Sequence, residues 1–300
     1  MKVSHLLRLY EEGHRDFSGA DLRGADLSQV TLIGVKLTGA NLMGANLSRA
    51  FLTKADLSGA NLNWVNLSFV KMSEAKLVEA DLTKANLSGA FMVKCKLPRA
   101  KLSGANVNSA NLRGANLWGA NLCGASLQRS NLREANLSGV NLNWANLVES
   151  RLMGARLYGA SLIGVNFSRA FLKGVDLSGV DLEGVNLSEA KLGGANLEGA
   201  NLIGANLTEA NLRLANLKGA DLTGAKLAQA SLEQANLTWT ILSKADLSDA
   251  DLSQATLRGA NLESAQLSGA IMPELAQNLF ASRGGTTAVS FDEAAEAMVI

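Results

Sequence analysis

The sequence has few of the residues from which catalytic and metal sites are usually built. It contains only two histidines, His5 and His14, and both precede the repetitive part of the chain. Histidine therefore cannot supply a metal cluster or an acid–base pair over most of the protein. Ser and Asp are abundant but stand in regular rows without a paired base, and Gly recurs too evenly to mark one phosphate-binding loop. We expect no enzyme, and the sequence predicts no catalytic residue, metal ligand or cofactor.

Long apolar runs and a dominant charge are also missing. The apolar runs are a few residues long, whereas about 20 residues are needed to cross a bilayer. The formal net charge of +1 implies no general attraction to nucleic acid or to membranes. The opening residues, MKVSHLL, lack the apolar segment of a signal peptide. These features predict a protein without a membrane span, located in the cytoplasm.

A five-residue repeat fills most of the chain. From Phe17 to Met272 every fifth residue is Leu, Phe, Met or Val, and 46 of these 52 positions are Leu. Around an α-helix a step of five residues turns by about 140° from the previous Leu, so no helical face would collect them. The order Ala, Asn or Asp, Leu instead fits a short extended segment whose first and third residues point inward. The next two residues, often Ser-Gly or Thr-Gly, fit a turn with Gly at positive φ.

Extended segments separated by corners are expected to wind into a coil. The pattern A-(D/N)-L-x-x, as in residues 40–44 (ANLMG), resembles the pentapeptide-repeat family, and the first repeats resemble its cyanobacterial members. The resemblance implies an all-β fold, a right-handed quadrilateral β-helix (a β-solenoid) with four pentads in each 20-residue coil, and 52 pentads then give 13 coils. Internal copies favour the same period, because residues 61–64 (NLNW) recur at residues 141–144, a shift of 80 residues.

The repeat defines the expected domain organisation. Residues 16–272 are predicted to form the β-helix as one domain. Residues 1–15 are predicted to contain a helix that begins after an N-cap at Ser4, ends at Gly13 and covers the first coil. Residues 273–300 are predicted to form a C-terminal capping helix and a tail.

Positions within the pentad predict which side chains are buried. Outward Asn residues that recur every 20 residues, at Asn46, Asn66, Asn86 and Asn106, are expected to form a ladder of stacked amides. Cys95 falls on a small inward position and Cys123 on an outward one, which disfavours a disulfide between them. The Leu positions predict the structural core, represented by Leu57, Leu77, Leu117, Leu137, Leu177 and Leu197.

Charged and aromatic residues are unevenly distributed around the expected coil. Residues 85–173 carry a net charge of +9 and residues 174–274 a net charge of −7. One wall, formed by the pentads whose Leu recur every 20 residues from Leu32, has Phe at three positions where Asn is usual. Its carboxylates up to residue 213 are Glu74 and Glu134. Lys54, Lys71 and Lys94 also lie on this wall, and its candidate partner-binding residues are Arg113, Arg133, Arg151, Lys173, Lys191, Arg213, Phe51, Phe91 and Phe171.

Basic side chains interleaved with aromatic ones suit an acidic protein or a polyanion. A simpler interpretation is that Lys and Arg keep a sheet surface soluble. We interpret the chain as a non-enzymatic interaction scaffold for a protein partner, either a monomer or an end-to-end dimer, with nucleic acid a less favoured ligand. The resemblance implies an alternative, a DNA mimic that binds DNA gyrase or another nucleic-acid-binding protein. Family members of that kind are acidic along much of their length and commonly have Phe-rich cores, unlike this chain.

Overall fold

A computed structural model describes residues 1–274 of the chain. The chain divides into two compact units, residues 1–161 and residues 162–300, which we call the first and the second unit and describe separately. The C-terminal capping helix and tail expected within residues 273–300 lie, from residue 275 on, outside the described residues.

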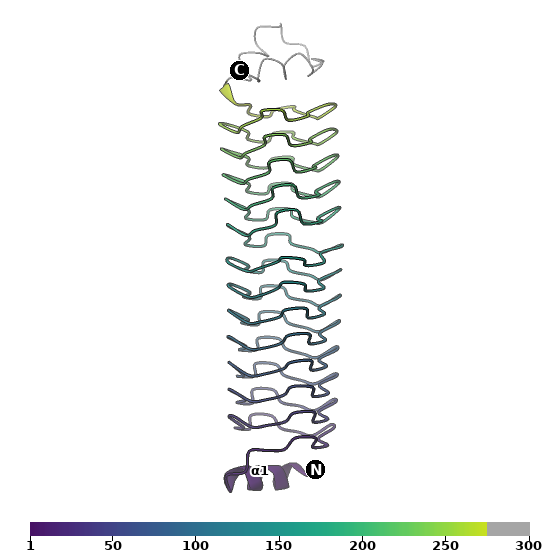
Figure 1. Cartoon of the computed structure of the whole chain (residues 1–300), viewed down its shortest axis with the longest axis vertical. Helices are drawn as coiled ribbons and strands as arrows, with labels where there is room; N and C mark the ends of the chain where they lie inside the picture. Colours follow the sequence, from purple (N-terminus) through teal and green to yellow (C-terminus); the bar gives the residue numbers. More distant parts are fainter. Residues whose placement is uncertain (275–300) are drawn as a thin grey trace. The chain divides into compact units, whose positions relative to one another are not determined.

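Parallel bridges between residues 20 positions apart define the coils of each unit. Asn41 pairs with Asn61 in the first unit, and Asn196 pairs with Asn216 in the second. The same 20-residue shift joins the outward residue of one pentad to that of the next coil throughout each unit, so that four pentads make one coil and successive coils stack within the unit (Figure 1).

Backbone hydrogen bonds account for every amide of a standard pentad, as in residues 41–45. Asn41 N–H donates to the preceding coil, and the N–H groups of Leu42 and Gly44 donate to the next coil. The Ala45 N–H closes the turn onto the Leu42 carbonyl at 2.9 Å. The remaining amide, of Met43, donates to Asn41 Oδ1 at 3.2 Å. Asn or Asp at the outward position therefore supplies an acceptor that the backbone itself lacks, which explains its frequency in the repeat.

The corners are tight turns with a positive φ at the fifth residue of each pentad, from Gly19 to Gly269. Together with the turn hydrogen bond, positive φ at the third turn residue alone is typical of a type II turn, which favours Gly. About half of these corners nevertheless carry another residue, such as Trp64 at φ 60°. Large corner side chains lean over the next coil. The Phe69 ring lies where a Cβ on Gly89 would stand only 2.5 Å from it, so Gly is needed there to make room.

Proline fits the same hydrogen-bonding scheme. Pro98 follows Leu97 in the turn, at a position whose amide normally donates to the outward Asn. Here the outward residue is Lys96, which offers no acceptor, and Pro98 has no N–H to satisfy. Its carbonyl still accepts from the Glu79 N–H of the preceding coil at 3.0 Å.

The inward positions form the core of each unit. The six leucines named from the sequence, Leu57, Leu77, Leu117, Leu137, Leu177 and Leu197, are all at most 1% exposed. Outward amides form the predicted ladder, in which Asn66, Asn86 and Asn106 each donate to the amide oxygen one coil earlier, at 3.1, 3.3 and 3.4 Å.

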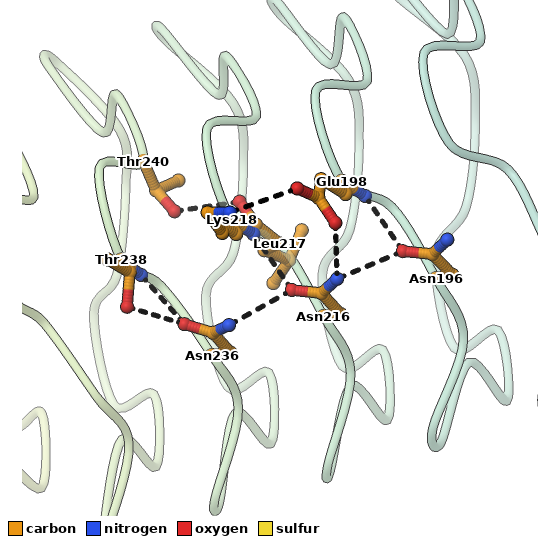
Figure 2. A network of polar contacts seen from close by, with 8 residues as sticks. All are labelled: Asn196, Glu198, Asn216, Leu217, Lys218, Asn236, Thr238 and Thr240. Atoms are coloured by element: carbon orange, nitrogen blue, oxygen red, sulfur yellow. Dashed lines mark hydrogen bonds and ion pairs between the residues drawn. The ribbon is translucent and has the colours of Figure 1, made fainter.

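A similar ladder in the second unit runs from Asn196 through Asn216 to Asn236 (Figure 2). Asn216 also donates to Glu198 Oε2 at 3.1 Å, and Lys218 Nζ lies 3.3 Å from the other oxygen of that carboxylate. These side chains bridge adjacent coils on the outside, as the backbone does beneath them.

Helix α1 (Val3–Glu11) precedes the first coil. Its N-cap is Lys2 and makes no side-chain capping bond, so the expectation that Ser4 caps the helix is wrong. The reason is that the Lys2 carbonyl already accepts the N–H groups of His5 and Leu6, at 3.1 and 3.2 Å, and this places Ser4 inside the first turn. Gly13, at φ 97°, follows the helix end.

Side chains of α1 contact the first coil of the first unit (Figure 1). Leu6 is fully buried, and the Tyr10 hydroxyl donates to the Ile33 carbonyl at 3.0 Å. In later coils the equivalent carbonyl accepts a corner N–H from the preceding coil, as the Thr53 carbonyl does from Gly34 at 2.9 Å. Tyr10 thus replaces a donor that the first coil has no earlier neighbour to provide.

Candidate functional site

The sequence-predicted wall falls into one set of residues in each unit. In the first unit, bridges join Phe51 to Lys71 and Lys71 to Phe91, and continue through Asn111 and Asn131 to Arg151. In the second unit, Phe171 pairs with Lys191, and Lys173 and Arg213 belong to the same repeated pentad position. We call the residues Phe51, Lys71, Phe91, Arg113, Arg133 and Arg151 the first-unit wall.

Two exposed aromatic rings flank a lysine on the first-unit wall. The side chains of Phe51 and Phe91 are 36% and 47% exposed. Lys71 lies between them in the bridge sequence, and its Nζ is 4.6 Å from the centroid of the Phe51 ring. A cation at this distance from a ring is attracted by the ring's π-electrons. The column therefore presents an ammonium group between two apolar surfaces.

The two phenylalanines each remove a backbone hydrogen-bond acceptor. Each occupies the outward position where Asn would accept the amide two residues later. Within the described part of the chain, the Thr53 N–H and the Val93 N–H have no hydrogen-bond acceptor. A hydrogen bond of this kind contributes a net ~0.5–1.5 kcal/mol to stability. Phe at these positions is therefore less favourable for the fold than Asn would be.

Carboxylates neutralise only some of the basic residues. Arg113 Nη2 lies 2.9 Å from Glu134 Oε1 in the first unit, and Arg213 Nε lies 3.2 Å from Glu233 Oε2 in the second. By contrast, the ammonium of Lys71 and the guanidinium of Arg151 have no carboxylate partner among residues 1–274.

Arg133 is unusual because its Nε is buried and has no hydrogen-bond partner in the described structure. The free positive charge of the wall therefore lies at its two ends, near Lys71 and near Arg133 and Arg151.

The sequence matches the protein family described as Pentapeptide repeats over overlapping segments that run from residue 16 to residue 272. This chain belongs to the pentapeptide-repeat family. The match covers most of the chain and rests on the same five-residue period that builds the coils. It identifies a repeat family and points to no catalytic family.

Solved pentapeptide-repeat structures resemble this pentapeptide-repeat protein to different degrees. HetL, a pentapeptide repeat protein involved in heterocyst differentiation regulation from the cyanobacterium Nostoc sp. strain PCC 7120, is 33% identical, with 91% of this chain and 98% of HetL covered and a TM-score of 0.33. A pentapeptide repeat protein from the Arabidopsis thaliana thylakoid lumen is also 33% identical, with coverages of 31% and 65% and a TM-score of 0.31. QnrB1, a plasmid-mediated fluoroquinolone resistance protein, is 17% identical, with coverages of 87% and 100% and a TM-score of 0.28. A comparison with curated proteins found no match.

Other chemically notable groups of this pentapeptide-repeat protein lie away from the wall. Lys84 Nζ stands 4.5 Å from the Trp64 ring centroid, a basic–aromatic pair that the sequence reasoning missed although the residues are 20 positions apart. Burial raises the pKa of the Cys95 thiol to about 12, and its Sγ lies 2.8 Å from the Met72 carbonyl. Residues 1–274 contain no group of His, Cys, Asp and Glu able to hold a metal ion. No helix in that range has the length and apolarity to span a membrane.

Proposed function

We propose that this pentapeptide-repeat protein is a non-enzymatic interaction scaffold that binds an acidic protein through the first-unit wall. The proposal takes the coils to form a right-handed quadrilateral β-helix. The four pentads in each bridged 20-residue coil support that form. A stack of parallel bridges is a rigid support, and it holds wall residues at fixed spacings.

The observation that carries the proposal is the pair of exposed phenylalanines at Asn positions. Phe51 and Phe91 leave apolar surface in water and leave an amide without its usual acceptor. Both effects lower stability, and neither improves the core. Exposed aromatic side chains are, however, the residues that contribute most to binding energy when a partner covers them. A binding role therefore accounts for a choice that the fold disfavours.

Charge supports an acidic partner. Lys71 and Arg151 have no carboxylate partner within residues 1–274, and the Nε of Arg133 is unpaired there. Carboxylates of a partner would complete these interactions. The alternative, a DNA mimic that binds gyrase, requires a surface of carboxylates, and the first-unit wall is basic. The cytoplasmic location expected from the sequence stays a prediction.

Affinity capture with the full chain tests the proposal. The wall variants are Phe51→Asn with Phe91→Asn, and Lys71→Glu with Arg151→Glu. The matched control is Phe171→Asn, which makes the same change at the same pentad position in the second unit. We expect both wall variants to lose a protein, identified by mass spectrometry, that the wild type and the control retain. Raising the salt concentration from 0.1 M should weaken its capture, because exposed charges are screened beyond ~10 Å at that ionic strength.

The same variants separate binding from folding. Restoring Asn at Phe51 and Phe91 should raise the free energy of unfolding by ~0.5–1.5 kcal/mol for each new hydrogen bond. Loss of binding together with a gain in stability would match a functional role for the rings. Retention of every captured protein by both wall variants would refute the proposal, and loss in Phe171→Asn alone would move the binding surface to the second unit.

A further inference from the structure

We infer that the partner presents an acidic amphipathic α-helix to the first-unit wall, lying along the direction in which the coils stack. This inference rests on the proposed function and adds the form of the partner. It depends on the spacing of three residues that successive bridges hold in one column, Phe51, Lys71 and Phe91.

The spacing of the two rings matches two turns of a helix. Bridged strands lie about 4.8 Å apart, so the two bridges from Phe51 to Phe91 separate their backbones by about 10 Å. Residues i and i+7 of an α-helix lie on the same face and are about 10.5 Å apart along the axis. Two apolar side chains at i and i+7 can therefore contact Phe51 and Phe91 at the same time.

An extended peptide along the column does not match this spacing. Side chains on one face of a strand recur at about 6.8 Å and about 13.6 Å, and the residue near 10 Å points to the opposite face. A strand that crossed the column at right angles would contact one coil and miss the second ring. The column thus favours a helix over a strand as the element that covers both phenylalanines.

Charge on the wall sets the remaining contacts of the helix. Lys71 lies midway between the rings, opposite residues i+3 and i+4 of the helix, which share the face of i and i+7. A Glu at either place would meet an ammonium that the Phe51 ring already holds at 4.6 Å. Five bridges separate Phe51 from Arg151, about 24 Å at the same strand spacing, which corresponds to about i+16.

A second carboxylate near i+16 would also be close to Arg133, which lies in the coil before Arg151. The Arg133 Nε is buried without a partner, and a guanidinium binds a carboxylate through two parallel hydrogen bonds. The predicted recognition pattern is therefore apolar at i and i+7, acidic at i+3 or i+4, and acidic again near i+16.

Fluorescence anisotropy with a synthetic peptide tests the inference on the full chain. The probe is a labelled, alanine-based peptide with leucines at i and i+7 and glutamates at i+3 and i+16, whose helicity is verified by circular dichroism. A matched isomer moves the second leucine to i+5, which turns it about 140° away from the first. We expect saturable binding of the probe, and at least about tenfold weaker binding of the isomer, as loss of one well-packed contact produces.

Protein variants locate the contact. Phe51→Asn and Phe91→Asn should each weaken probe binding by about tenfold or more, whereas Phe171→Asn should change it by less than about twofold. Equal binding of the probe and its isomer, or unchanged binding by both wall variants, would overturn the inference.

Two other ligands are tested alongside. A labelled oligothymidine that binds through the same phenylalanines in place of the peptide would assign the wall to single-stranded nucleic acid. Self-association of the full chain that Phe51→Asn abolishes would assign it to a second copy, and either result would overturn the inference. Absence of saturable peptide binding would remove the helical form of the partner, while the capture experiment would still decide the scaffold function by itself.

Discussion

Removal of a buried hydroxyl from Ser130 is expected to stabilise the first unit. Ser130 and Ser150 occupy the small inward position that is usually Ala, both are fully buried, and neither Oγ has a hydrogen-bond partner. Thr240 occupies the same kind of position in the second unit, but its Oγ1 donates to the Leu217 carbonyl at 2.8 Å (Figure 2). The described structure thus contains buried hydroxyls in both conditions, with and without a partner.

The two conditions predict opposite effects of removing the hydroxyl. In proteins, a buried hydroxyl without a partner destabilises the fold by about 1–3 kcal/mol, whereas a bonded one contributes about 0.5–1.5 kcal/mol. We therefore expect Ser130→Ala to raise the free energy of unfolding by about 1 kcal/mol, since loss of the oxygen's packing offsets part of the gain. Thr240→Val, which keeps the shape, should lower it by about 1 kcal/mol. Ala110→Ser, one coil before Ser130, should reproduce the cost of an unpaired hydroxyl.

Urea unfolding followed by tryptophan fluorescence measures these effects. Trp118 and Trp144 report on the first unit and Trp239 on the second. A change in stability appears as a shifted midpoint at an unchanged denaturant slope. If Ser130→Ala left the midpoint unchanged or lowered it, the Ser130 hydroxyl would have to be hydrogen-bonded in solution, and the reasoning would be refuted. The double variant with Ser150→Ala should gain less than twice as much if the adjacent positions interact.

Three further predictions follow from burial and backbone geometry. Leu137→Asp should abolish cooperative unfolding of the first unit in circular dichroism, because it replaces ~1.5–3 kcal/mol of burial with an unpaired charge; a wild-type transition would contradict its inward placement. Iodoacetamide should alkylate Cys123, which is half-buried, and leave Cys95 unmodified until denaturant is added, since burial raises the Cys95 pKa to about 12; mass spectrometry showing equal labelling would disprove this. Gly89→Ala should lower the urea midpoint more than Gly124→Ala. Both have positive φ, but only the first has a ring 2.5 Å from the added Cβ, and equal effects would show that the ring moves aside.

The regular part of the fold could be predicted from the sequence because each pentad position has one physical requirement. Leu and Ala fill the interior, Asn accepts an otherwise unpaired amide, and the corner requires a positive φ. The shift between Asn46 and Asn66 gave the coil length directly, and the amide ladder at these residues confirms it. Helix α1 was less predictable in detail. Ser4 is a favourable N-cap by composition, but two amides already bind the Lys2 carbonyl, a choice that no local sequence rule determines.

The candidate wall could be predicted only as a composition. Summing the sequence by coils places Phe51, Lys71 and Phe91 in one column, as the bridges do. Which charges remain free could not be predicted, because it depends on side-chain conformation. Arg113 reaches Glu134 in the next coil, whereas Arg133 leaves its Nε buried and unpaired. Such differences between neighbouring arginines follow from packing of individual side chains, which a repeat pattern does not encode.

The constant 20-residue shift of the backbone bonds also bears on how such chains change in length over generations. Duplication or loss of one coil-length stretch of coding sequence restores the same donors and acceptors at the join, whereas a single-pentad insertion moves every later residue to the neighbouring wall. Residues 48–52 and residues 168–172 share the sequence SRAFL, 120 residues apart, a separation of whole coils. Selection can therefore lengthen or shorten this architecture in coil-sized steps while the pattern on each wall is inherited intact. Length is a heritable variable here that is nearly independent of fold, as it is not in proteins with one closed core.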